Sequence, residues 1–144
     1  MQENPLRSPE DYELFLYTIT EQFTVVRHST VTFVRVGETL ARVAGELYFD
    51  GSVRIVVRER LLYDRLPLTI EWYGYEVWKD EEKLYWYDSQ AHPNDPVLES
   101  SYPHHKHIPP DIKHNRIPAP EMGFNKPNIP TLIENAEKCV NQST

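Results

Sequence analysis

The chain has only one cysteine, Cys139, which excludes an intramolecular disulfide. No apolar run is long enough to cross a bilayer, and no charged and apolar leader is evident. Basic residues are the minority, with 15 lysines and arginines against 22 acids and a formal net charge of -7. This charge excludes adhesion of the whole surface to nucleic acid or anionic lipid. We therefore expect a soluble, cytoplasmic protein that makes no membrane contact and meets a polyanion only through a local basic patch.

The first part of the chain predicts a helix followed by a sheet. A length of 144 residues fits one domain, which we assign to residues 1–144. Ser8-Pro9-Glu10-Asp11 supplies a capping hydroxyl, a proline and an acid, and apolar residues at helical spacing extend the helix over 8–23. From 25 to 88 the apolar period changes to two, which predicts an antiparallel meander of about five strands. Asp50-Gly51 favours a tight hairpin turn with positive φ at both residues.

The C-terminal third has a different composition. Eight of the twelve prolines lie within 89–128, a density that argues against long helices and interior strands. We predict a long Pro/His-rich functional loop there and a second helix over 129–141, where apolar residues return to helical spacing. The fold class is therefore α+β, with an N-terminal helix packed on an antiparallel meander sheet of about five strands, a Pro/His-rich loop and a C-terminal helix.

Reactive side chains are concentrated in the run Ser101-Tyr-Pro-His-His-Lys-His107. In extended backbone, His105 and His107 would point to one side while His104 and Lys106 point to the other. Near neutral pH, a histidine pair can hold one neutral base and one protonated acid, as cleavage of RNA through its 2′-hydroxyl requires. We predict metal-independent acid-base chemistry without a cofactor, and the catalytic candidates are His104, His105, Lys106, His107 and His92.

Cationic and aromatic side chains are the candidates for holding a phosphate and its neighbouring bases. The strand after Asp50-Gly51 carries an arginine stripe on one face, for which the simpler interpretation is a solvated surface whose charge Glu59 and nearby acids balance. A phosphate-binding surface is the functional interpretation, with a tyrosine next to the histidines stacking on a base. The candidate residues are Arg54, Arg58, Arg60, Arg116 and Tyr102.

Three other interpretations of the histidine run stay open. The first is a polar loop whose histidines bond only to backbone or water. The second is a zinc-type site in which His105, His107 and His92 combine with Asp88 or Asp95, although no His-Glu-x-x-His or Cys-x-x-Cys element is present. The third is a non-catalytic interaction module, in which the sheet and the last helix bind a protein partner or a second copy in a homodimer. Under that interpretation the histidines only shape the interface.

Two segments carry a resemblance to a known family. The stretch Leu84-Tyr-Trp-Tyr-Asp-Ser-Gln-Ala-His-Pro93, followed by Ser101-Tyr-Pro-His-His-Lys-His-Ile108, resembles the R-Y-D-N-A-P-H-H-P … F-P-H-H-K-H signature of the TumE-type toxin family of prokaryotic type II toxin-antitoxin modules. The helix and the Asp50-Gly51-Ser52 hairpin upstream are also similar, so that the resemblance covers roughly residues 8–110. It implies a ribonuclease-like toxin that acts on RNA and is neutralised by a cognate DNA-binding antitoxin.

The resemblance also implies which residues matter. The signature falls on these positions of the chain: Asp88, His92, Pro93, Pro103, His104, His105, Lys106 and His107. On this basis Asp88 joins the substrate-binding candidates. The chain departs from the signature at Ser89, where the family has asparagine, and at Gln90-Ala91-His92, where one histidine of the family pattern is missing. The tail after Asp111 lies beyond the recognised part.

Overall fold

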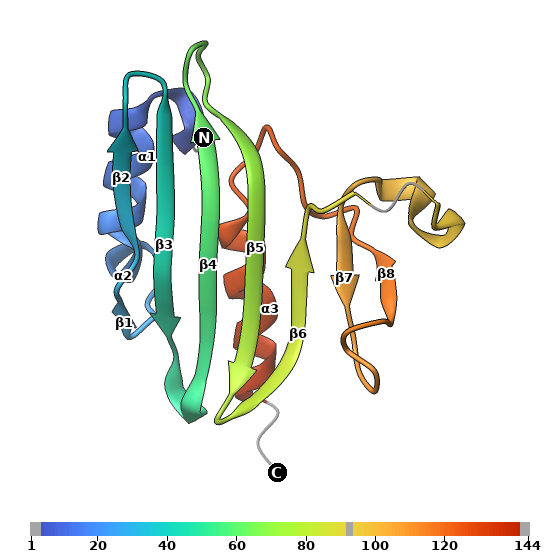
Figure 1. The fold of residues 1–144 in the computed structure, drawn as a ribbon. Coiled ribbons are helices and arrows are strands. Elements are labelled where there is room, and N and C mark those ends of the chain that lie inside the picture. Colours follow the sequence, from blue (N-terminus) through green and yellow to red (C-terminus); the bar gives the residue numbers. More distant parts are fainter. Residues whose placement is uncertain (1–3, 92–93, 142–144) are drawn as a thin grey trace.

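The computed structural model describes residues 4–91 and 94–141, which form an antiparallel sheet with helices on one face (Figure 1). The sheet has eight strands in the order β1-β3-β4-β5-β6-β7-β8, and β2 also pairs with β3. The strands are β1 His28–Ser29, β2 Thr32–Val36, β3 Leu40–Tyr48, β4 Val53–Leu62, β5 Thr69–Lys79, β6 Glu82–Asp88, β7 His105–His107 and β8 Arg116–Pro118. The helices are α1 Pro9–Tyr17, α2 Ile19–Gln22 and α3 Ile129–Asn141, with short 3-10 turns at η1 Pro5–Arg7, η2 Asp50–Ser52 and η3 Pro96–Ser101. The α+β class is confirmed.

The first helix begins where the sequence predicts. The Ser8 hydroxyl accepts a hydrogen bond from the backbone N–H of Asp11 at 3.1 Å. The predicted helix over 8–23 is divided in two, because Thr18 leaves helical geometry and its hydroxyl donates to the Leu14 carbonyl at 2.7 Å. Side chains that bond to the preceding turn in this way often bend helices, and here α1 ends at Tyr17 and α2 begins at Ile19.

The sheet gains strands at both ends relative to the prediction. β1 and β2 lie along the same edge of β3 and are separated near Val31, where the chain passes so close to Gly45 that a Cβ on this glycine would lie 2.4 Å from the Val31 Cα. β7 and β8 come from the Pro/His-rich segment. The turn after β3 also differs, since positive φ occurs at Gly51 and Ser52 rather than at Asp50 and Gly51.

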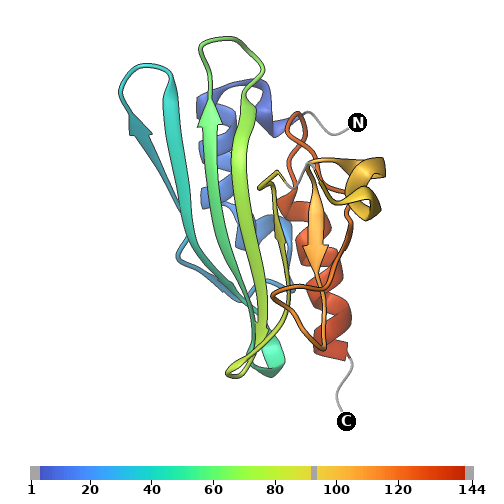
Figure 2. The same cartoon turned by 45° about the vertical axis from the view of Figure 1, so that its right-hand side comes forward.

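Helices α1 and α3 cover one face of the sheet and enclose the apolar core (Figures 1 and 2). A buried carboxylate lies within this core. Glu59 of β4 accepts hydrogen bonds from the hydroxyls of Tyr12 at 2.6 Å and Tyr75 at 2.5 Å. The Asn128 amide, just before α3, donates to the Tyr75 hydroxyl at 3.1 Å. These contacts form the Glu59 cluster, which ties both helices to the sheet. Within the described residues, each helix is too short or too polar to span a membrane.

The opposite face of the sheet carries the arginine stripe. Arg54, Arg58 and Arg60 alternate with buried residues along β4. Their carboxylate partners are Glu46, Glu76 and Glu71 respectively. The expectation that Glu59 balances these charges is wrong, because its odd position in β4 places it on the helix-covered face.

Candidate functional site

The histidine run forms a strand in the interior of the sheet. His105, Lys106 and His107 make up β7, which pairs with β6 on one side and β8 on the other. The prolines at 103 and 109 lie outside this strand, so the backbone N–H groups of residues 105–107 are all present and can pair with the neighbouring strands. The expectation that prolines exclude interior strands from this segment is therefore wrong for these three residues.

The pairing decides which face each side chain occupies. His105 lies opposite Asp88, Lys106 opposite Tyr87, and His107 opposite Trp86. Directly paired residues of an antiparallel sheet share a face, so both histidines project on the side of Asp88, away from the helices. The predicted separation of His105 and His107 from Lys106 is confirmed.

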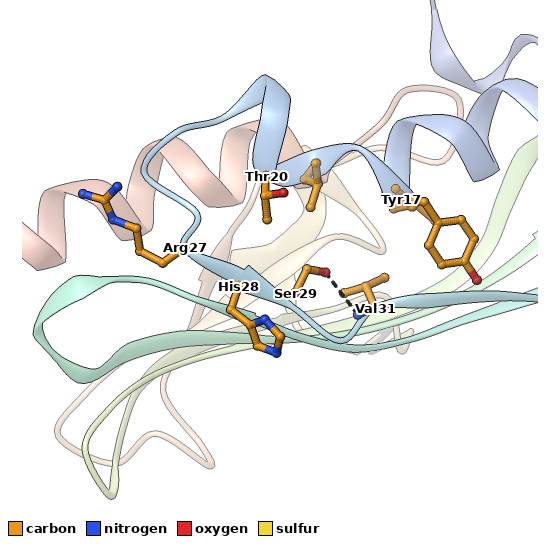
Figure 3. A pocket seen from close by; sticks show the side chains of 8 residues that line it. Tyr17, Thr20, Arg27, His28, Ser29 and Val31 are labelled. Carbon is orange, nitrogen blue, oxygen red and sulfur yellow. Dashed lines mark hydrogen bonds between the residues drawn. The ribbon is translucent and has the colours of Figure 1, made fainter.

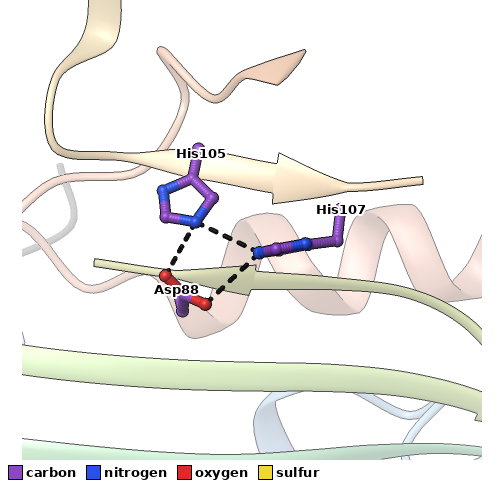
Figure 4. A group of neighbouring side chains, drawn as sticks. All are labelled: Asp88, His105 and His107. Carbon is purple, nitrogen blue, oxygen red and sulfur yellow. Dashed lines mark hydrogen bonds and ion pairs between the residues drawn. The ribbon is translucent and has the colours of Figure 1, made fainter. Parts of the chain in front are cut away.

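Three side chains meet in what we call the Asp88 cluster (Figure 4). The Asp88 Oδ1 atom lies 2.8 Å from the His105 Nε2 atom, and Oδ2 lies 3.4 Å from the His107 Nε2 atom. The two Nε2 atoms are 3.1 Å apart. His105 is 0% and His107 4% exposed, whereas the Asp88 side chain is 22% exposed. The cluster is therefore buried and opens to solvent at the carboxylate.

The other nitrogen of each ring is committed to the backbone. The Nδ1 atom of His105 lies 3.0 Å from the Pro103 carbonyl oxygen, and that of His107 lies 2.9 Å from the Ile112 carbonyl oxygen. A carbonyl oxygen can only accept a hydrogen bond, so each Nδ1 carries a proton and donates it. Each Nε2 then presents either a lone pair or a second proton to the centre of the cluster.

The environment separates the protonation of the two rings. Burial opposes a charged His105, but the hydrogen bond to Asp88, the hydrogen bond to the Pro103 carbonyl and the charge of Asp88 together outweigh it and raise the pKa of His105. Burial lowers the pKa of His107 to about 3, although Asp88 acts in the opposite direction. Burial also opposes a charged Asp88, but the hydrogen bond from His105, the charge of His105 and the backbone N–H of Gln90 together lower the pKa of Asp88. The environment therefore favours a protonated His105 and a neutral His107 next to an ionised carboxylate.

Cations and a tryptophan surround His107. The Trp86 ring packs edge-on against it with centroids 4.5 Å apart, and the Lys83 ammonium lies 4.0 Å from the centroid of that tryptophan. Arg116 lies opposite His107 in β8 and reaches Asp95 at 3.7 Å. The Trp86 Nε1 and Arg116 Nε atoms are buried without a hydrogen-bond partner among the described residues. Buried donors without a partner are unusual in folded proteins.

Two of the predicted catalytic residues lie on the helix-covered face. The His104 Nδ1 atom is 2.6 Å from the Tyr73 hydroxyl, and the two rings stack with an interplanar angle of 1°. The Lys106 ammonium lies 4.2 Å from the centroid of Tyr85, and burial lowers the pKa of this lysine. The structure thus brings neither His104 nor Lys106 to the Asp88 cluster.

The remaining candidates lie on β4 and next to β7. Tyr102 is 48% exposed, just before β7, and the arginine stripe shares the face of the Asp88 cluster. Residue His92 lies outside the described residues. The sequence did not single out Lys83 or Trp86. The pairing between β5 and β6 shifts register between Val77 and Trp78, and this irregularity turns Lys83 toward Trp86.

A separate hollow lies between α2 and β1, at the other end of the sheet (Figure 3). It has a volume of about 210 Å³ and is lined by Tyr17, Thr20 and His28, among others. The His28 ring stacks on Tyr48 at 5.6 Å. Its lining includes one histidine and no carboxylate, so it lacks the convergence of ligand atoms found at Asp88.

The chain is similar to a known family along most of its length. A family model described as Toxin TumE matches residues 16–138. The matched range includes all three members of the Asp88 cluster and extends beyond Asp111 into α3, farther than the two signature segments predict. No curated protein and no solved structure matches the chain.

Proposed function

The chain belongs to the TumE toxin family, and we propose that it is the toxin of a toxin-antitoxin module and acts as a metal-independent endoribonuclease in the cytoplasm. The observation that carries this proposal is the Asp88 cluster, in which a cationic and a neutral imidazole lie side by side on a cation-bearing face. A cognate antitoxin protein with a DNA-binding element would neutralise it.

The cluster supports a transesterification of RNA. The bare Nε2 atom of His107 accepts the proton of a 2′-hydroxyl, whose oxygen then bonds to the adjacent phosphorus. The 5′-oxygen leaves as the P–O bond breaks and receives a proton from His105. The products are a 2′,3′-cyclic phosphate and a 5′-hydroxyl. Asp88 orients His105 and stabilises its positive charge, as its 2.8 Å contact indicates.

Substrate binding falls to residues on the same face. Arg116, which pairs with His107 in the sheet, and Lys83, which lies over Trp86, would stabilise negative charge on the phosphate. Arg54, Arg58 and Arg60 extend the cationic surface across the sheet, although each also pairs with a carboxylate. Tyr102, exposed beside β7, is available to stack on a base. RNA would therefore lie along the helix-free face.

The test is cleavage of RNA by purified protein in the presence of a chelator. We expect wild type and His114→Gln to cut structured and unstructured RNA, leaving cyclic phosphate ends detected by mass spectrometry. His114 is the matched control because it is exposed on the same segment and pairs only locally with Asp111. His105→Gln and His107→Gln should leave the RNA intact. Uncut RNA with wild type, or equal cutting by all variants, would exclude the mechanism.

Growth arrest on expression provides a second measurement. An arrest that disappears in the His105→Gln and His107→Gln variants supports a catalytic toxin. An arrest that persists in both variants would favour the non-catalytic interaction module, in which the sheet and α3 bind a protein partner. Antitoxin binding is measured separately, by co-purification with the product of an adjacent reading frame.

A further inference from the structure

We propose that Asp88, His105 and His107 also bind one divalent transition-metal ion of the zinc type, and that this ion inhibits the toxin by occupying the Nε2 atoms of both rings. The binding site follows from the geometry of the Asp88 cluster alone. The inhibitory effect rests on the proposed ribonuclease function. The experiments below keep the two parts distinct.

The cluster concentrates electron pairs in one small volume. With both Nδ1 atoms donating to backbone carbonyls, the two Nε2 atoms and the carboxylate point at a common centre. Two neutral rings would therefore place two nitrogen lone pairs against an anion with no donor between them. The volume requires a positive charge, which either a proton on His105 or a metal ion can supply.

The spacing of the ligand atoms suits a metal ion. The two Nε2 atoms lie 3.1 Å apart, the His105 Nε2 atom lies 2.8 Å from Asp88 Oδ1, and the His107 Nε2 atom lies 3.4 Å from Asp88 Oδ2. Zinc bonds of about 2.0–2.1 Å at tetrahedral angles place neighbouring ligand atoms about 3.3–3.4 Å apart. The two nitrogens, and each nitrogen with its nearest carboxylate oxygen, are thus spaced close to what one ion needs. Three protein ligands leave a fourth position, which the exposure of Asp88 opens to water.

The surroundings of the rings match those of metal-binding histidines. Histidines that bind a metal through one nitrogen commonly donate the other N–H to a carbonyl or carboxylate, which sets the tautomer and the ring orientation. Both rings here do so, through the carbonyls of Pro103 and Ile112. The packing of Trp86 against His107 further limits rotation of that ring. The ligand atoms are therefore arranged before any ion arrives.

The ligand types select the class of metal. Imidazole nitrogens with one carboxylate suit zinc and its neighbours in the transition series, whereas calcium and magnesium prefer sets of oxygen ligands. The cationic Arg116 and Lys83 lie nearby and oppose an incoming cation, so we expect weaker binding than at a closed site of four protein ligands.

Metal titration tests the site directly. Protein purified without a histidine tag and stripped with chelator is titrated with Zn²⁺ by calorimetry, and with Co²⁺ by visible absorption. We expect one equivalent to bind, and the affinity to fall at least tenfold in Asp88→Asn and His107→Gln while His114→Gln binds as wild type. Melting curves check folding, because Zn²⁺ should raise the Tm of wild type and His114→Gln only. No stoichiometric binding, or equal binding by all four proteins, would overturn the site.

RNA cleavage tests the inhibition. Cutting by the stripped protein should fall as the site fills with Zn²⁺ and return when chelator is added. Cleavage that increases with Zn²⁺ would overturn the inhibitory role. Whether the metal binds at these residues would then be decided by the titrations alone. Uncut RNA in the stripped and loaded states alike would reject the ribonuclease function and the inhibition together, while the calorimetry would still decide whether the metal binds.

Discussion

Two carboxylates lie on opposite faces of the same sheet, Glu59 toward the helices and Asp88 away from them, and their partners differ in kind. Glu59 is 2% exposed and accepts hydrogen bonds from two tyrosine hydroxyls. Asp88 is partly exposed and faces two imidazoles. Burial is thus only one of the factors that separate a structural carboxylate from a reactive one. The readiness of its partners to exchange protons also matters.

The tyrosine partners hold their protons firmly. Burial raises the pKa of Tyr12 and Tyr75 well above the ordinary value, and the charge of Glu59 acts in the same direction. Burial also raises the pKa of Glu59 itself, against the hydrogen bonds that it accepts. All its donors come from fixed positions in α1 and β5. The Glu59 cluster therefore stabilises the fold, whereas imidazoles exchange protons near neutral pH, as the proposed chemistry of the Asp88 cluster requires.

The largest expected effect in this comparison is on stability. Glu59→Ala leaves two buried hydroxyls without an acceptor, and we expect the free energy of unfolding to fall by about 3–5 kcal/mol. Asp88→Ala should cost only about 1–2 kcal/mol, because water can reach the vacated position. Urea denaturation followed by tryptophan fluorescence measures both. Equal losses in the two variants would contradict the division into a structural and a reactive carboxylate.

For RNA cleavage, the order of the two carboxylates should be the reverse of their order for stability, so that the Asp88 amide variant loses more activity than the Glu59 amide variant. Asp88→Asn removes the anion that orients His105, and we expect the rate of RNA cleavage to fall about 100-fold or more. Glu59→Gln should leave the rate per folded molecule unchanged, since the tyrosine cluster lies on the other face. Initial rates, corrected for the folded fraction by circular dichroism, give the comparison. A loss in Glu59→Gln as large as in Asp88→Asn would remove the distinction.

Two tyrosines that stack on each other in β5 sharpen the comparison further. Tyr75→Phe removes the donation to Glu59 and the acceptance from Asn128, so we expect a loss of about 1–2 kcal/mol. Tyr73→Phe removes only the contact with the half-buried His104, and should cost about 0.5–1 kcal/mol. Thermal unfolding of both variants under the same conditions tests the order. The reverse order would place the stabilising network at His104 instead.

The smallest expected effect concerns RNA binding by the helix-free face. Arg58→Ala should reduce the slope of log affinity against log salt by about one, with little change in stability because its ion pair with Glu76 is half exposed. Arg35→Ala is the control, since Arg35 pairs with Glu10 of α1 on the other face. Filter binding over a series of salt concentrations gives the slopes. Equal slopes for both variants would show that Arg58 in the arginine stripe makes no contact with the RNA phosphates.

Local patterns predicted those parts of the fold that depend on neighbouring residues. Ser8 caps α1 as predicted, and the alternation along β7 places His105 and His107 on one face. Proline density predicts a loop over residues 105–107, and three residues alone carry too little strand propensity to correct this prediction. Their order comes from pairing with β6 and β8, which are distant in sequence.

Irregular pairing explains the side chains that sequence reasoning missed. Strict alternation puts Lys83 on the face opposite Trp86, whereas the register shift near Trp78 brings the two together. The sequence around Glu59 does indicate that its carboxylate is buried, since Glu59 stands between Val57 and Leu61 in an otherwise apolar series of alternate residues. An acid at such a position requires buried donors, but the sequence does not reveal which tyrosines supply them.

The Asp88 cluster can form only late in the synthesis of the chain, because its residues lie in two different strands. Asp88 belongs to the sixth strand, whereas both imidazoles arrive with the seventh, after residues 89–104 have been added. A nascent chain that has not released residues 105–107 has no such centre, whatever the state of its earlier strands. Any activity that depends on these three side chains therefore begins late in translation.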